Sequence, residues 1–127
     1  MNISQNQLEK FKIISAFRKY TRLGLANNKL SAFDAYDRIR GVSKNRDEAL
    51  DLLAVYDTLR ILKISGKSEI VDAIYAIYFD AIIRKPQKNE ISLKIVRYAY
   101  ETHCDERTVY RQLQYARKLY KLLRDNM

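Results

Sequence analysis

The sequence contains very few of the residues that break a chain or build a reactive site. Its 127 residues include three glycines, one proline, one cysteine and one histidine. A single cysteine excludes an intrachain disulfide and suits a reducing compartment, so we expect a cytoplasmic protein. Because helix breakers are few and Leu, Ile, Lys, Arg and Ala are common, the composition favours an all-α fold.

Long apolar runs are also missing. The most apolar stretch, residues 70–83, contains Asp72 and Asp80 and is shorter than the roughly twenty residues that span a bilayer. The N-terminus, MNISQNQLEK, starts polar and lacks the apolar centre of a secretory signal. We therefore expect no transmembrane segment and no membrane partner.

Catalytic and metal-binding chemistry lack suitable residues. His103 and Cys104 are neighbours, and adjacent residues on a helix point about 100° apart, which suits a nucleophile and its base poorly. A structural zinc site uses about four ligands, and no further Cys or His is present. Three scattered glycines form no phosphate-binding loop. The sequence predicts no enzyme activity, no metal and no cofactor.

Positive charge is what the sequence has in excess. Twenty-four Lys and Arg residues face fifteen Asp and Glu residues, for a formal net charge of +9. A small protein of this charge attracts polyanions through counterion release. Charge alone does not separate DNA from RNA, an anionic membrane or an acidic partner, but nucleic acid is the favoured partner.

Apolar residues at three- and four-residue spacing predict about six helices and no sheet. The expected segments are residues 4–26, 31–41, 45–63, 68–84, 90–102 and 106–124. Ser31 and Asn45 are the expected N-caps of the second and third helices. Gly41 and Gly66 are expected to end those helices, and Pro86 blocks continuation of the fourth. Inward faces are expected to include Leu8, Phe11 and Phe17 in the first helix and Phe33 and Tyr36 in the second.

Two features concern the N-terminal part. The hinge residues 65–67 divide the chain into an N-terminal helical region, 1–64, for oligomerisation or partner contact, and a DNA-binding region, 65–127. The first expected helix carries a group of basic residues: Lys10, Lys12, Arg18, Lys19 and Arg22. An ordinary solvated flank is the simpler interpretation of this group, and an auxiliary phosphate-contacting surface is the alternative.

The strongest pattern lies in the last two expected helices. In ISLKIVRYAYETHCDERTVYRQLQYARKLYKLLRDN, a short turn at His103 and Cys104 separates two amphipathic segments, which is the layout of a helix-turn-helix. Asp105 is the expected N-cap of the second segment, and Glu106 suits the positive end of that helix. The expected inward residues of this segment are Val109, Leu113, Ala116, Tyr120 and Leu123.

The outward and marginal residues of the last helix are the candidate DNA-binding residues. They are Arg107, Thr108, Arg111, Gln112, Gln114, Tyr115, Lys118 and Lys121. Residues near the N-terminus of a recognition helix reach base edges, so Arg107, Thr108 and Arg111 are the candidates for base contact.

The remaining candidates divide by chemistry. Arginine matches the two acceptors of guanine, and Gln112 or Gln114 could pair with adenine. Lys118 and Lys121 are expected at phosphates.

Ten tyrosines and four phenylalanines suggest base stacking on single strands as an alternative. Most aromatic residues lie at apolar helical positions, however, so core packing explains them better.

Two segments resemble known families. DERTVYRQLQYARKLYKLL resembles the end of region four of bacterial sigma factors, in which a capped recognition helix carries a similar run. DTLRILKISGKSEIVDAIYAIYF, followed by NEISLKIVRYAYETHCDERTVYR, is similar to phage regulators of the ArpU and RinA type, over about residues 57–124. The resemblance implies control of late gene transcription in phages and prophages of Gram-positive bacteria, with Arg107, Thr108 and Arg111 at the bases. The family-like turn usually carries Ser at position 105, where Asp105 still caps the helix but would repel a phosphate.

These observations predict a sequence-specific double-stranded DNA-binding regulator of phage transcription, an activator of late genes. Its N-terminal helices would form a homodimer or contact host RNA polymerase. One alternative is a small terminase-like packaging protein, which also combines a helix-turn-helix with oligomerising helices. Another is a helical interaction module, such as an anti-repressor, that does not touch DNA.

Overall fold

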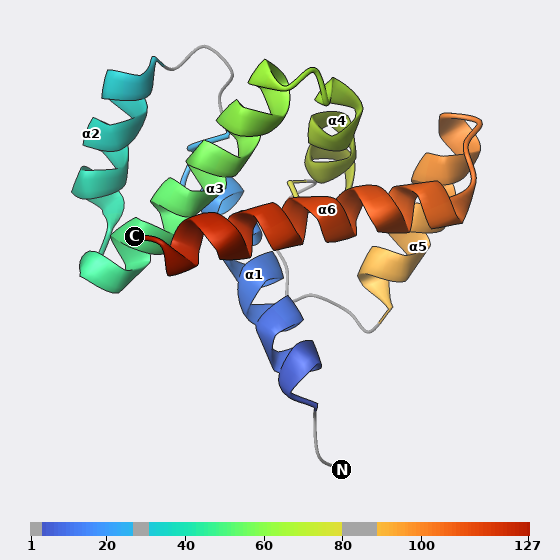
Figure 1. The fold of residues 1–127 in the computed structure, drawn as a ribbon, viewed down its shortest axis with the longest axis horizontal. Helices are drawn as coiled ribbons and strands as arrows, with labels where there is room; N and C mark the ends of the chain where they lie inside the picture. The colour runs from blue at the N-terminus through green and yellow to red at the C-terminus, as the bar shows by residue number, and fades with distance from the viewer. Residues whose placement is uncertain (1–3, 27–30, 80–88) are drawn as a thin grey trace.

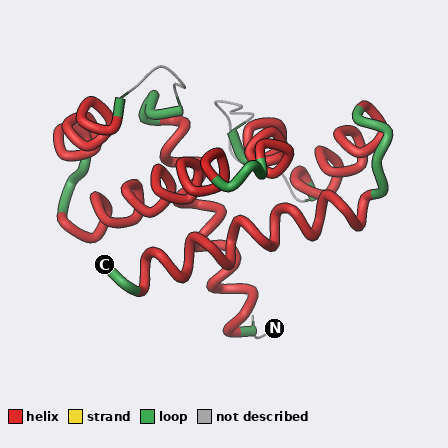
Figure 2. Tube along the Cα trace, turned by 45° about the horizontal axis from the view of Figure 1, so that its top comes forward, coloured by secondary structure: helices red, strands yellow, loops and turns green. Residues whose placement is uncertain are grey.

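The computed structural model describes residues 4–26, 31–79 and 89–127, which form six α-helices and no strand (Figures 1 and 2). The expected all-α fold is confirmed. The helices are α1 (Gln5–Arg22), α2 (Ala32–Val42), α3 (Arg46–Ile64), α4 (Ser68–Ile77), α5 (Glu90–Glu101) and α6 (Glu106–Asp125). In Figure 1, α6 runs across the molecule, with α2 near one end and α5 at the other.

Side-chain caps determine where several helices begin. The Ser31 hydroxyl accepts a hydrogen bond from the Asp34 backbone N–H at 3.2 Å, and the Asn45 side chain accepts one from the Glu48 N–H at 2.9 Å. Both predicted N-caps are confirmed. Each satisfies a backbone donor that the helix itself cannot pair, which is worth about 1 kcal/mol.

Two glycines determine where α1 and α3 end. Gly24 and Gly66 have φ angles of 76° and 75°, a left-handed conformation that glycine adopts without strain. The chain then turns back, so that the Leu25 N–H bonds to the Tyr20 carbonyl at 3.1 Å. The prediction at Gly66 is confirmed. The first helix ends at Arg22 rather than at residue 26, because the left-handed residue stops the helical ladder.

Gly41 does not end the second helix as predicted. It lies inside α2, and the cap residue is Ser43, with a φ angle of −78°. The backbone N–H and the hydroxyl of Ser43 both bond to the carbonyl of Ile39. A serine whose backbone and side chain both bond to the Ile39 carbonyl therefore ends this helix, and no left-handed residue is needed.

The fourth helix ends at Ile77, before the predicted end at residue 84. After Ile77 the backbone turns, and the N–H groups of Tyr78 and Phe79 both bond to the Ile74 carbonyl. Tyr78 and Phe79 are buried, so packing of their rings favours this early turn. The predicted stop at Pro86 and the predicted break at residues 27–28 lie outside the described residues.

One hydrophobic core joins the helices, and Phe17 of α1 lies at its centre. The Phe17 side chain is 0% exposed, and its ring centroid lies 5.4 Å from that of Tyr78 and 5.7 Å from that of Tyr120. Helix α6 also contacts α1, α3, α4 and α5. The buried cluster therefore crosses the suggested division between residues 64 and 65.

Four residues expected on inward faces are exposed instead: Leu8, Phe11, Phe33 and Tyr36. At about 100° per residue, Leu8 and Phe11 lie roughly 120–180° around α1 from Phe17, so they are off the buried face of this helix. Helix α2 contacts only α3 among the described helices, so Ala35 and Ile39 are enough to fill that contact. Apolar periodicity identified these helices correctly, but it overestimated how much of each face is covered.

Candidate nucleic-acid interface

Helices α5 and α6 are joined by a four-residue turn, residues 102–105, that is closed by backbone hydrogen bonds. The Cys104 N–H bonds to the Ala99 carbonyl at 3.0 Å, and the His103 N–H bonds to the Tyr100 carbonyl at 3.3 Å. The Asp105 carboxylate then accepts from the Arg107 N–H at 2.9 Å, which confirms the predicted cap of α6. Helix α4 packs against both α5 and α6. The turn and the contacts with α4 therefore hold α5 and α6 in a defined relative orientation.

His103 occupies the position of this turn that Gly24 and Gly66 occupy after α1 and α3. Its φ angle is 55°, a left-handed conformation that costs a residue with a Cβ about 1–2 kcal/mol. We expect His103→Gly to raise the free energy of unfolding by about 0.5–1 kcal/mol. The gain is smaller than the strain that is relieved, because glycine also gives the unfolded chain more freedom. Urea unfolding measures the change. Tyr100→Gly, at an exposed helical position of α5, should instead lower the free energy of unfolding by about 1 kcal/mol. A loss of stability in His103→Gly would contradict this account.

Helix α6 has one buried face and one charged face. Val109, Leu113, Ala116 and Tyr120 are buried, as predicted, and Leu123 is partly covered. The opposite face carries four exposed residues at spacings of four, three and four. We call these four residues the basic stripe: Arg107, Arg111, Gln114 and Lys118. Because the two faces are opposite, the core anchors α6 while the basic stripe stays open to a ligand.

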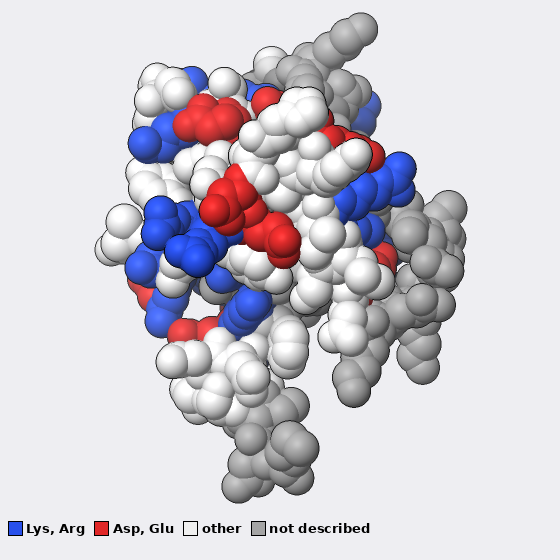
Figure 3. Space-filling model, turned by 90° about the vertical axis from the view of Figure 1, so that its right-hand side faces the viewer, with Lys and Arg blue, Asp and Glu red and all other residues white. Residues whose placement is uncertain are grey.

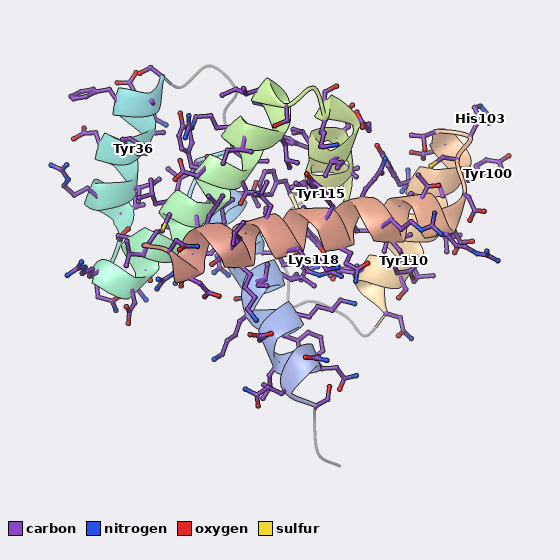
Figure 4. The ribbon with its side chains drawn as sticks, in the orientation of Figure 1. Tyr36, Tyr100, His103, Tyr110, Tyr115 and Lys118 are labelled. Carbon is purple, nitrogen blue, oxygen red and sulfur yellow. The ribbon has the colours of Figure 1, made fainter. Side chains whose placement is uncertain are left out.

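The two margins of the stripe differ from each other. Tyr115 is exposed, and the ammonium group of Lys67 lies 5.2 Å from the centre of its ring, which is a cation–π contact. Lys67 precedes α4, so a cation from another element joins this margin. Figure 4 shows Tyr115 on the side of α6 nearer α4, and Tyr110 and Lys118 on the other side. Thr108 is exposed, whereas Gln112 is half-buried.

Lys121 has a different environment from Lys118, although both were predicted at phosphates. The Lys121 ammonium lies 2.7 Å from the carboxylate of Glu9 on α1. The hydrogen bond from Lys121 to Glu9 raises the pKa of Lys121, and its charge is balanced within the protein. The Arg124 guanidinium is likewise held, 2.8 Å from Asp51 on α3. The last two cations of α6, Lys121 and Arg124, thus contact α1 and α3.

A groove of about 380 Å³ separates α1 from α6 and contains residues that the sequence interpretation missed. Arg117 was not predicted as a site residue, and it lines the groove together with Lys10, Gln114 and Lys118. The Arg117 guanidinium donates to the Tyr78 hydroxyl at 2.7 Å. Its placement near Lys10 and Tyr78 depends on how other helices pack against α6, and helical periodicity within α6 does not reveal it.

Basic and acidic side chains lie beside each other on the surface at the α5 end of the molecule. Figure 3 shows one group of Lys and Arg side chains at the left of this view and another at the right, with acidic side chains between them. Near the turn, the Asp105 carboxylate is used as the cap, and Glu101 pairs with Arg97 at 2.9 Å. The Asp105 and Glu101 carboxylates beside the turn are therefore engaged within the protein.

Within residues 4–26, 31–79 and 89–127, no cluster of three or more His, Cys, Asp or Glu side chains could hold a metal ion. No helix in the same ranges is long and apolar enough to cross a membrane. Comparison of the chain with protein-family models, curated proteins and solved structures finds no match.

Proposed function

We propose that this chain binds double-stranded DNA through α5, the turn and α6, as a helix-turn-helix with α6 as the recognition helix. The basic stripe is the observation that carries the proposal. An α-helix with its side chains is about 10–12 Å across, and the major groove of B-DNA is about 12 Å wide. With one face of α6 anchored in the core, the other can enter the groove without disturbing the fold.

The first two turns of α6 would contact bases. Arg107 and Arg111 are exposed and lie one helical turn apart, and Thr108 lies beside them. Arginine can donate two hydrogen bonds to guanine in the major groove. Gln114 is exposed and Gln112 is half-buried, so Gln114 is the better candidate for adenine.

Phosphate contacts would flank this region. Lys118 belongs to the basic stripe, and Lys67 lies at the margin beside Tyr115. Lys121 contributes less, because Glu9 balances its charge. Such contacts orient the protein on the duplex without reading its sequence.

The biological role that we propose is regulation of phage transcription, as an activator of late genes. This step rests on the similarity of residues 57–124 to regulators of the ArpU and RinA type and to region four of sigma factors. The N-terminal helices would then form a homodimer or contact RNA polymerase. Helix α2 is suited to such a contact because Phe33 is 79% exposed and α2 contacts only α3 among the described helices.

A helical interaction module is the second candidate. Helix α5 carries an exposed apolar row at spacings of three and four, formed by Leu93, Val96 and Tyr100. Such a row suits contact with another protein. In this case the positive charge would serve an acidic partner, and the chain would have no affinity for DNA.

Selection from a pool of random duplexes, followed by titration of the enriched duplex and a scrambled one, tests the proposal. We expect the enriched duplex to bind at least about 1,000-fold more tightly at physiological salt. Affinity for both duplexes should fall steeply as salt rises, because phosphate contacts release counterions. If no duplex is enriched and no salt-dependent binding is found, the DNA proposal fails and the interaction module is favoured.

A further inference from the structure

The basic residues of α1 are not equivalent in the folded protein. The Arg18 guanidinium lies 3.6 Å from the carboxylate of Glu90, and the Lys19 ammonium lies 2.7 Å from that of Glu48. Lys10 has no ion pair with any carboxylate in the described part of the chain. It lies beside Arg117 of α6, and both line the two grooves that separate α1 from α5 and α6.

Arg117 is held in place by a neutral partner. Its guanidinium donates to the hydroxyl of Tyr78, whose side chain is 1% exposed within the core. Burial raises the pKa of Tyr78, so the hydroxyl stays protonated and contributes no negative charge. The contact therefore restricts the position of the Arg117 guanidinium without balancing its positive charge.

Two neighbouring cations without a counter-charge repel each other. Burial, and then the charge of Arg117, lower the pKa of Lys10, which shows that its charged form is disfavoured there. The carboxylates that line the same grooves are already engaged. Glu9 pairs with Lys121 at 2.7 Å, and Glu90 pairs with Arg18 and Lys94. An anion between Lys10 and Arg117 would relieve the repulsion.

We propose that Lys10 and Arg117 together bind a backbone phosphate of DNA, so that α1 forms part of the DNA interface. This inference rests on the proposed function. The groove that contains the pair also contains Gln114 and Lys118 of the basic stripe, so a duplex on the stripe has a phosphate-binding pair at its edge. The arginine fork and the lysine point charge both suit phosphate oxygens. The contact is independent of sequence and orients the duplex.

Lys10→Gln, compared with Lys12→Gln, tests this assignment on DNA. The two residues lie on the same helix but point about 200° apart, and Lys12 lines a different groove with Asp47 and Asp51. We expect Lys10→Gln to reduce the slope of log affinity against log salt by about 0.9, the value for one phosphate contact. Enriched and scrambled duplexes should lose affinity equally, and Lys12→Gln should keep the wild-type slope.

A second measurement uses sulfate as the probe and needs no DNA. At equal ionic strength, replacing chloride by sulfate should raise the thermal midpoint of the wild type and Lys12→Gln more than that of Lys10→Gln. An equal gain in all three proteins would overturn the anion-binding pair. If the wild type binds DNA and Lys10→Gln keeps its salt slope, the phosphate assignment fails and the proposed function stands. If the wild type binds no DNA, the proposed function itself fails.

Discussion

Replacing Phe17 with alanine is expected to lower the free energy of unfolding by about 3–5 kcal/mol, the usual loss when a buried aromatic ring is deleted. The ring is fully buried and lies against Tyr78, Phe79 and Tyr120. These partners come from the end of α4 and from α6, so the cavity would open where α1, α4 and α6 meet. A typical domain is stable by only about 5–15 kcal/mol, so a large share of the stability would be lost.

Urea unfolding followed by circular dichroism measures this change, and Phe33→Ala is its matched control. Phe33 is exposed on α2, so the same deletion there should change the stability by no more than about 0.5 kcal/mol. Because the core crosses the division at residue 64, Phe17→Ala should still unfold in one transition. Two separate transitions, or equal losses in the two variants, would contradict a shared core.

The double variant Arg107→Ala and Arg111→Ala is expected to weaken binding to the enriched duplex by roughly 30-fold or more. Each bidentate contact between arginine and guanine discriminates by about 1–3 kcal/mol, and about 1.4 kcal/mol corresponds to a tenfold change. Both side chains are exposed on α6, so their removal should leave the fold and its unfolding midpoint nearly unchanged. Binding to a scrambled duplex should weaken less, because phosphate contacts remain.

The control is a second double variant, Arg38→Ala and Arg40→Ala. Both of these arginines are exposed on α2, so the net charge changes by the same amount away from α6. We expect this control to keep its preference for the enriched duplex over the scrambled one. Equal effects of the two double variants on that preference would show that Arg107 and Arg111 act only through general charge.

Much of the local structure could be predicted from the sequence. Ser31, Asn45 and Asp105 cap helices as expected, because each cap involves only residues two or three positions away. The two faces of α6 were also predicted, since helical periodicity places Val109 and Leu113 opposite Arg111. Glycine was a weaker signal. Gly66 ends α3, while Gly41 lies inside α2, because glycine permits a left-handed turn but hydrogen bonds decide whether one forms.

The coverage of helix faces was harder to predict. Both Phe11 and Phe17 were expected on the inward face of α1, but only Phe17 is buried. The two residues are six positions apart, which places them roughly 120° apart around the helix. Apolar residues therefore lie on more than one side of α1, and only the packing of the other helices decides which side is covered.

The sequence by itself determined that this chain is helical, where most helices begin, and which face of α6 carries the basic stripe. These properties depend on neighbours within one or two helical turns, so they can be predicted from spacing. Only the tertiary structure decided which cations keep an unbalanced charge. Glu9 neutralises Lys121, whereas Lys10 and Arg117 lie together without a carboxylate partner among the described residues. Those relations join α1 to α6, near opposite ends of the chain, and they exist only because both helices pack into the same core around Phe17.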